Sequence, residues 1–117
     1  MTVYLANAFS LNMLPSAKRV KIEVTELGKT VFCVQLRNYR PENAIGHEST
    51  VQLVNELCGT DYKVNRAQIK LGTDTVFVVQ VSERLPEGKV LTKDEILKLY
   101  NEGKIKFYRV DVVEVEE

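Results

Sequence analysis

The 117-residue chain contains a single histidine, two cysteines and three prolines, and it has no charge excess of either sign. It also has no apolar run near the roughly 20 residues that a membrane-spanning helix needs. The positive charges near the N-terminus follow the apolar part, the reverse of a secretory signal, so we expect a cytoplasmic protein. Because 16 basic residues balance 16 acidic ones, we expect no long nucleic acid as a partner, and we expect any nucleotide ligand to be small.

The two cysteines, Cys33 and Cys58, lie far apart in the chain and in apolar surroundings. Neither belongs to a Cys-x-x-Cys pair or neighbours a histidine cluster, so their spacing predicts no metal site. Of the two remaining states, the pattern favours buried free thiols over a disulfide, although intracellular proteins of hyperthermophiles are an exception to that preference. We expect neither a metal nor another cofactor.

The hydrophobic pattern predicts more strands than helices. Apolar runs and period-two alternation indicate strands over residues 2–9, 20–27, 30–36, 62–71, 75–81 and 105–115. Turn residues after positions 27 and 71 predict two hairpins, one formed by the second and third of these strands and the other by the fourth and fifth. The segment from Ser10 to Arg19 mixes polar and apolar residues and is predicted to be a connecting loop.

Two helices are predicted, over residues 49–58 and about 93–102. Each begins with the spacing of a capping box, Ser49 with Gln52 in the first and Thr92 with Glu95 in the second. A glycine follows each predicted C-terminus. Together the elements predict one α+β domain over residues 1–117, with a mixed five- or six-stranded sheet flanked by two main helices.

The histidine, His47, follows Gly46 at the predicted start of the first helix. Backbone N–H groups in the first turn of a helix have no intrahelical partner, and with the positive end of the dipole they attract anions. Ser49 and Thr50 add hydroxyl donors at the same place. A bound phosphate would favour the protonated imidazole, which can then act as a general acid on a leaving oxygen. The alternative, a capping or surface histidine, is favoured by these residues alone.

Other polar side chains are placed where they can complete a phosphate site. Arg66 and Arg84 lie at the ends of predicted strands, where guanidinium groups can bind phosphate oxygens or serve as ordinary surface charges. Residues 83–92, between a strand and a helix, are either a lid or an ordinary loop. The polar residues after the first strand suit hydrogen bonds to a base or phosphate, or simple turn formation: Asn7, Ser10 and Asn12.

A series of stretches resembles the viral ring nucleases, an anti-CRISPR family that disarms type III CRISPR signalling. In chain order these stretches are "VYLANAFSLNML", "NAIGHEST", "LVNELCGT", "VNR", "RLPEGKVL" and "GKIKFY". They span residues 3–108 at similar spacing, which makes the set more specific than any one motif. Only the acidic tail "VDVVEVEE" has no assigned counterpart.

The resemblance implies a homodimeric, metal-independent enzyme that binds its ligand at the dimer interface. The implied substrate is cyclic tetra-adenylate, the second messenger of the type III effector, which is cut into linear di-adenylates ending in 2′,3′-cyclic phosphate. Neither a membrane nor long nucleic acid is an expected partner, and a viral enzyme of this kind would act in the host-cell cytoplasm. The alternatives are a non-catalytic protein that sequesters the messenger and a viral dimer acting on a protein or a DNA site.

By position, the resemblance implies that His47 is the general acid for the departing 5′ oxygen. Glu87 falls on a lid carboxylate that orients or deprotonates the attacking 2′-hydroxyl, and Arg66 and Arg84 fall on phosphate-binding arginines. Glu83 departs from the family pattern, which has an uncharged amide there. The remaining implied ligand contacts are polar side chains: Asn7, Ser10, Asn12, Ser49, Thr50 and Gln80.

Overall fold

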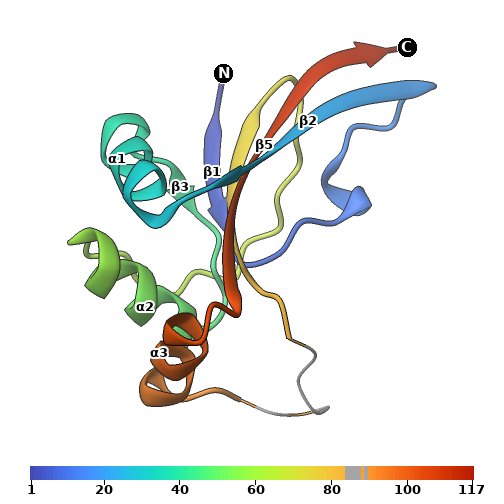
Figure 1. Ribbon diagram of the computed structural model, residues 1–117. Helices are drawn as coiled ribbons and strands as arrows, with labels where there is room; N and C mark the ends of the chain where they lie inside the picture. The colour runs from blue at the N-terminus through green and yellow to red at the C-terminus, as the bar shows by residue number, and fades with distance from the viewer. Residues whose placement is uncertain (84–87, 89) are drawn as a thin grey trace.

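The computed structural model describes residues 1–83, 88 and 90–117 (Figure 1). Its elements, in chain order, are β1 (Val3–Ala6), the 3-10 turn η1 (Leu11–Met13), β2 (Arg19–Leu27), α1 (Lys29–Tyr39), β3 (Glu42–Asn43), α2 (Glu48–Cys58), β4 (Thr75–Val81), α3 (Lys93–Asn101) and β5 (Ile105–Glu116). The five strands form one sheet in the order β2-β5-β4-β1-β3. β1 is parallel to β3 and β4, whereas β5 is antiparallel to β2 and β4. The sheet is therefore mixed, and the predicted α+β class is confirmed.

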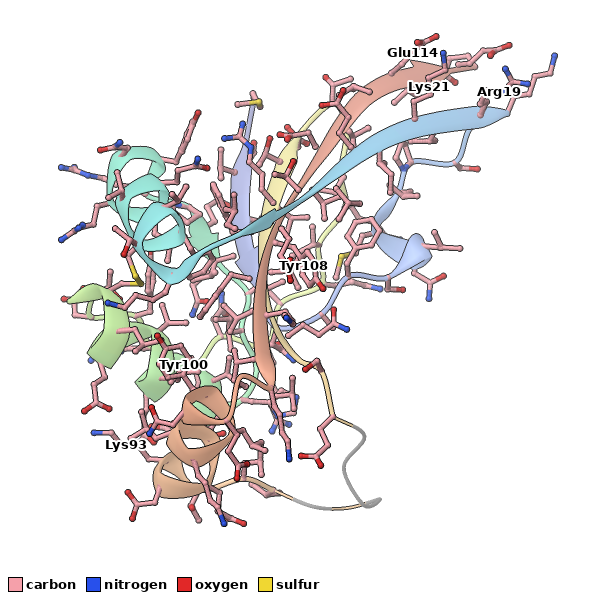
Figure 2. All side chains as sticks on the ribbon, in the orientation of Figure 1. Arg19, Lys21, Lys93, Tyr100, Tyr108 and Glu114 are labelled. Atoms are coloured by element: carbon pink, nitrogen blue, oxygen red, sulfur yellow. A yellow bond between two sulfur atoms is a disulfide. The ribbon has the colours of Figure 1, made fainter. Side chains whose placement is uncertain are left out.

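The helices α1, α2 and α3 all lie on one face of the sheet (Figure 1). The main core fills the space between them and the sheet, and it includes Phe32 of α1, Leu53 of α2, Ile96 of α3 and Phe77 of β4. A second apolar cluster covers the opposite face, where Tyr108 packs; Tyr100 packs on the helix side (Figure 2). In the part of the chain that the structure describes, no helix is long and apolar enough to cross a membrane.

β2 and β5 form a long antiparallel ribbon that extends beyond the other strands (Figure 1). Pairing runs from Arg19 opposite Glu116 to Leu27 opposite Phe107. At the far end, Lys21 and Glu114 form an ion pair of 3.3 Å (Figure 2). The ribbon makes β2 an edge strand of the sheet.

Residues 30–36, predicted as a strand, form most of helix α1 instead. Phe32 and Leu36 are buried at helical spacing, while Val31 and Val34 are 48% and 42% exposed on the other side. A short apolar run containing β-branched residues suits either a strand or a packed helix, and here packing against the sheet decides in favour of the helix. The third helix was therefore missed, and the first predicted hairpin is wrong because β2 pairs with β5.

The second predicted hairpin is also wrong. Residues 62–71 form neither a helix nor a strand, and among them only Ile69 and Leu71 are buried. The backbone of this segment bonds to neighbouring loops, for example from Leu71 N–H to the Met13 carbonyl at 2.8 Å. β4 takes β1 and β5 as its partners instead.

Cys33 and Cys58 form a disulfide, so the prediction of free thiols is wrong. The bond joins α1 to α2, and both sulfur-bearing side chains are buried. The error follows from the misassigned strand: once residues 30–36 are helical, α1 packs beside α2 and brings the two Cα atoms to 4.9 Å.

The helix termini match the predictions in part. Thr92 and Glu95 form the expected capping box at α3, with bonds of 3.1 and 3.2 Å in the two directions. Gly59 and Gly103 follow α2 and α3 with φ of 67° and 76°, values that favour glycine. The box predicted at Ser49 is wrong, because α2 begins one residue earlier and His47 is its N-cap.

Candidate functional site

A partly open cavity of about 570 Å³ lies at the N-terminus of α2. The segment after β1, the end of β4 and the residues before α3 form its other walls. Six of the polar residues singled out in the sequence line this cavity, although they come from four separate parts of the chain: Asn7, His47, Ser49, Thr50, Arg66 and Gln80.

His47 occupies the N-cap position of α2 in an extended backbone conformation. Its carbonyl accepts the first intrahelical bond, from Val51 N–H at 3.2 Å, but its imidazole makes no capping hydrogen bond. The side chain is exposed. The ring therefore does not occupy the N–H groups of the first turn, which is the geometry needed for an imidazole and an anion to share this helix end.

The first turn of α2 supplies both hydroxyl and carboxylate groups. Ser49 and Thr50 are buried, at 7% and 6% exposure, and both line the cavity. Glu48 also lines it, and Gln52 donates a weak 3.5 Å hydrogen bond to the Glu48 carboxylate. The sequence did not predict Glu48 as a site residue. Its carboxylate is negative like a phosphate, so a bound phosphate must compete with it for the positive N-terminal end of α2.

Gly46 joins two of the predicted ligand residues. Its N–H donates to the side-chain oxygen of Asn7 at 3.4 Å, and its carbonyl accepts from Nε of Arg66 at 3.0 Å. A Cβ atom at position 46 would lie only 2.8 Å from Cγ of Arg66. The absence of a side chain at Gly46 thus allows the arginine to lie against the loop that carries His47.

Ser10 and Asn12 do not line the cavity. They belong to the turn η1, where the Ser10 hydroxyl accepts from Asn12 N–H at 3.1 Å, and Lys70 donates to the Asn12 carbonyl at 3.1 Å. The predicted turn therefore accounts for these hydrogen bonds of Ser10 and Asn12. Arg84 and Glu87 lie outside the described residues.

Glu83, the residue that departs from the family pattern, forms an ion pair with Lys104 at 3.3 Å. Lys104 also approaches Glu102, at 3.5 Å. The hydrogen bond that Lys104 donates to Glu83 and the charge of Glu102 raise the pKa of Lys104 above its ordinary value. The carboxylate of Glu83 thus has a cationic partner beside it, which moderates its repulsion of an anion.

The sequence did not reveal the apolar walls of the cavity. An apolar surface of this kind suits the flat face of an aromatic ring. The walls come from the loop after β1, from β4 and from the residues before α3: Ala8, Phe9, Val79, Val81, Val90 and Leu91. Their identity depends on which strands are neighbours, so a single sequence gives no direct signal for it. Within the described ranges, no group of three or more His, Cys, Asp or Glu residues is arranged to hold a metal ion.

The fold and cavity define a single-domain α+β protein with a polar site at a helix N-terminus. The chain belongs to the STIV B116-like family of archaeal-virus proteins, which it matches over residues 3–114. The solved structure of B116 of Sulfolobus turreted icosahedral virus is similar with a TM-score of 0.77 and 43% identity, covering 94% of this chain and 98% of that one.

Two further relatives come from filamentous viruses. The uncharacterized protein ORF116 of Acidianus filamentous virus 1 (isolate United States/Yellowstone) is 44% identical over 109 residues, which are 92% of this chain and 93% of the relative. The uncharacterized protein 26 of Sulfolobus islandicus filamentous virus (isolate Iceland/Hveragerdi) is 31% identical over 97 residues, 82% and 81% of the two chains.

Proposed function

We propose that this protein is an anti-CRISPR ring nuclease that cleaves cyclic tetra-adenylate without a metal. One observation carries the proposal: the histidine, one arginine and four further polar residues that the resemblance assigns to the ligand line a single cavity. Three of them come from two loops and a strand far from α2 in the sequence, so their convergence is not a consequence of sequence proximity. Membership of a viral family agrees with a role against host signalling.

The chemistry needs few protein groups because RNA supplies its own nucleophile. The 2′-hydroxyl oxygen forms a bond to the adjacent phosphorus while the bond from phosphorus to the 5′ oxygen breaks, leaving a 2′,3′-cyclic phosphate. His47 donates a proton to the departing 5′ oxygen, the first-turn N–H groups of α2 stabilise the charged phosphorane, and Arg66 binds a phosphate of the substrate. Glu87 and Arg84, which lie outside the described residues, take the roles that the resemblance implies: the Glu87 carboxylate accepts the 2′-hydroxyl proton or orients that group, and Arg84 binds a second phosphate.

A homodimer completes the proposal, because a symmetric ring presents equivalent phosphates to two equivalent histidines. β2 is an edge strand, and beside it an apolar groove is lined by Phe9, Val24, Val78 and Tyr108. Gln80 lines both this groove and the His47 cavity. A second copy seated on the groove would therefore adjoin the site, and two cavities would face one ring.

The test is incubation of purified protein with cyclic tetra-adenylate in excess chelator, with products separated by chromatography. The proposal predicts linear di-adenylate with a 2′,3′-cyclic phosphate, and loss of that product in His47→Ala. An intact ring that stays tightly bound would contradict catalysis and support the alternative, a protein that sequesters the messenger. An intact ring with no binding would contradict both.

A further inference from the structure

Arg66 lies in a segment that has no regular structure of its own. Residues 62–71 contain no helix or strand, and Arg66 is exposed. The hydrogen bond from its Nε goes to the carbonyl of Gly46, 20 positions earlier in the chain, so it holds Arg66 to another loop and not to its own segment. An exposed arginine on an irregular segment loses much side-chain and backbone entropy when it is held in one place. Further contacts must therefore hold residues 62–71 against the loop that contains Gly46.

Asn43 supplies such a contact with both ends of its amide. Its side-chain oxygen accepts from Ile45 N–H at 3.0 Å, which forms a local turn just before Gly46. Its side-chain nitrogen donates to the carbonyl of Lys63, across to the irregular segment. One side chain therefore shapes the loop before His47 and ties the arginine-bearing segment to it.

Asn65 makes the reciprocal contacts from the other side. Its side-chain nitrogen donates to the Asn43 carbonyl at 2.8 Å, and its backbone N–H donates to the Ile45 carbonyl at 2.9 Å. The next residue along the chain is Arg66. Of the four hydrogen bonds just described for Asn43 and Asn65, three join the two segments directly before the arginine.

We propose that Asn43 and Asn65 are positioning residues that place Arg66 for binding the substrate phosphate. Neither lines the cavity, so each acts through the arginine rather than on the ligand. The assignment of phosphate as the ligand rests on the proposed function. The positioning itself is a property of the protein alone and can be measured without any ligand.

The activity test compares Asn43→Ser with a matched control, Asn38→Ser, on the exposed surface of α1. A serine at position 43 keeps an acceptor for Ile45 N–H but is too short to reach the Lys63 carbonyl, and it adds no charge near the site. We expect the half-saturating concentration of cyclic tetra-adenylate to rise about tenfold in Asn43→Ser and in Asn65→Ala, with a maximal rate within about twofold of wild type. Asn38→Ser should behave as wild type.

A double variant separates positioning from a general structural defect. If Asn43 acts through Arg66, Asn43→Ser combined with Arg66→Ala should bind no more weakly than Arg66→Ala alone. An additive loss in the double variant, or a fall in the maximal rate with unchanged half-saturation, would overturn the proposal.

The ligand-free test follows the Nε–H signal of Arg66 by heteronuclear NMR, with Arg66→Ala identifying the signal. We expect slow solvent exchange in wild type and Asn38→Ser, and fast exchange in Asn43→Ser and Asn65→Ala, each with its folded spectrum retained. Equal exchange in all four proteins would overturn the positioning role. If positioning holds in this measurement but the wild type neither binds nor cleaves the ring, the proposed function fails and the positioning role stands.

Discussion

The side chain of Arg66 lies directly against the backbone of Gly46, with Nε 3.0 Å from the Gly46 carbonyl oxygen. Position 46 has no left-handed φ, so its need for glycine comes from the arginine rather than from the backbone. Because a Cβ atom there would stand 2.8 Å from Arg66 Cγ, any side chain at position 46 must move the arginine. The loop before His47 and the side chain of Arg66 are thus mechanically coupled.

Gly46→Ala is expected to displace Arg66 and to weaken binding of cyclic tetra-adenylate about tenfold, while the thermal midpoint changes little. Isothermal titration with a non-cleavable ring analogue measures the affinity. Gly28→Ala is the matched control, because a Cβ atom there meets nothing within 4 Å. Equal affinities for the two variants would show that the contact with Arg66 has no part in binding.

The disulfide between Cys33 and Cys58 is expected to contribute about 3 kcal/mol to the free energy of unfolding, because it closes a loop of 25 residues in the unfolded chain. The double variant Cys33→Ala, Cys58→Ala should therefore unfold roughly 10 °C lower in calorimetry. Reduced wild-type protein should show a similar loss. A midpoint that does not respond to either change would contradict this contribution.

Arg109 connects β5 to α1 through several contacts. Nε donates to both carboxylate oxygens of Asp111 at 3.1 Å, one terminal nitrogen donates to Gln35 at 3.1 Å, and the guanidinium lies 5.1 Å from the ring centroid of Tyr39. Arg109 also donates a hydrogen bond to the Tyr39 hydroxyl, and this bond is the main reason why the pKa of Arg109 is raised above its ordinary value. The guanidinium of Arg109 is therefore charged at neutral pH.

Arg109→Lys keeps the charge but loses the planar fork, so it should lower the free energy of unfolding by about 1–2 kcal/mol in urea titrations. Lys106→Ala, on the same strand, removes only an exposed pair with Glu26 at 3.5 Å and should cost less than about 1 kcal/mol. The reverse order of the two losses would refute the role given to Arg109.

Asp74 makes stability depend on pH in the acidic range. Its carboxylate accepts from Thr2 N–H and Gly72 N–H, both at 2.8 Å, and these bonds lower its pKa from the ordinary 3.8. A lowered pKa in the folded state means that the ionised form stabilises the protein above the ordinary value, and that this stabilisation is lost as the pH falls through the lower folded-state value. Thermal midpoints should therefore fall on acidification below about pH 4, and less steeply in Asp74→Asn. Parallel pH profiles for the wild type and Asp74→Asn would contradict the stabilising role of the Asp74 carboxylate.

The elements that the sequence predicted well carry strong local signals. Helix α3 has both an amphipathic stripe and the Thr92–Glu95 box, and β5 has a long alternating pattern. Helix α1 has no such signal. Its N-cap residue, Gly28, makes no side-chain capping bond, and the apolar run of the helix is short, so only packing against the sheet shows that this segment is helical. Missing α1 also hid the partner of Cys33, because the disulfide depends on two helices lying side by side.

The candidate site was predictable where it is local and unpredictable where it depends on the tertiary fold. The position of His47 at a helix start follows from residues adjacent in the chain. The approach of Arg66 depends on an irregular segment held by Asn43 and Asn65, which no periodic pattern signals. Ser10 was predicted as a ligand contact or a turn residue, and in the structure its hydroxyl accepts from Asn12 N–H at the start of η1.

The most direct test of the central claim is a single-turnover measurement of ring opening in which the departing 5′ oxygen is replaced by sulfur. Sulfur leaves without needing a proton, so a variant without its general acid should be rescued on this substrate. With the natural ring we predict a rate loss of roughly 10²- to 10⁴-fold in His47→Ala, and with the sulfur ring a loss below about tenfold. An equal loss on both rings, or none on either, would contradict proton donation by His47.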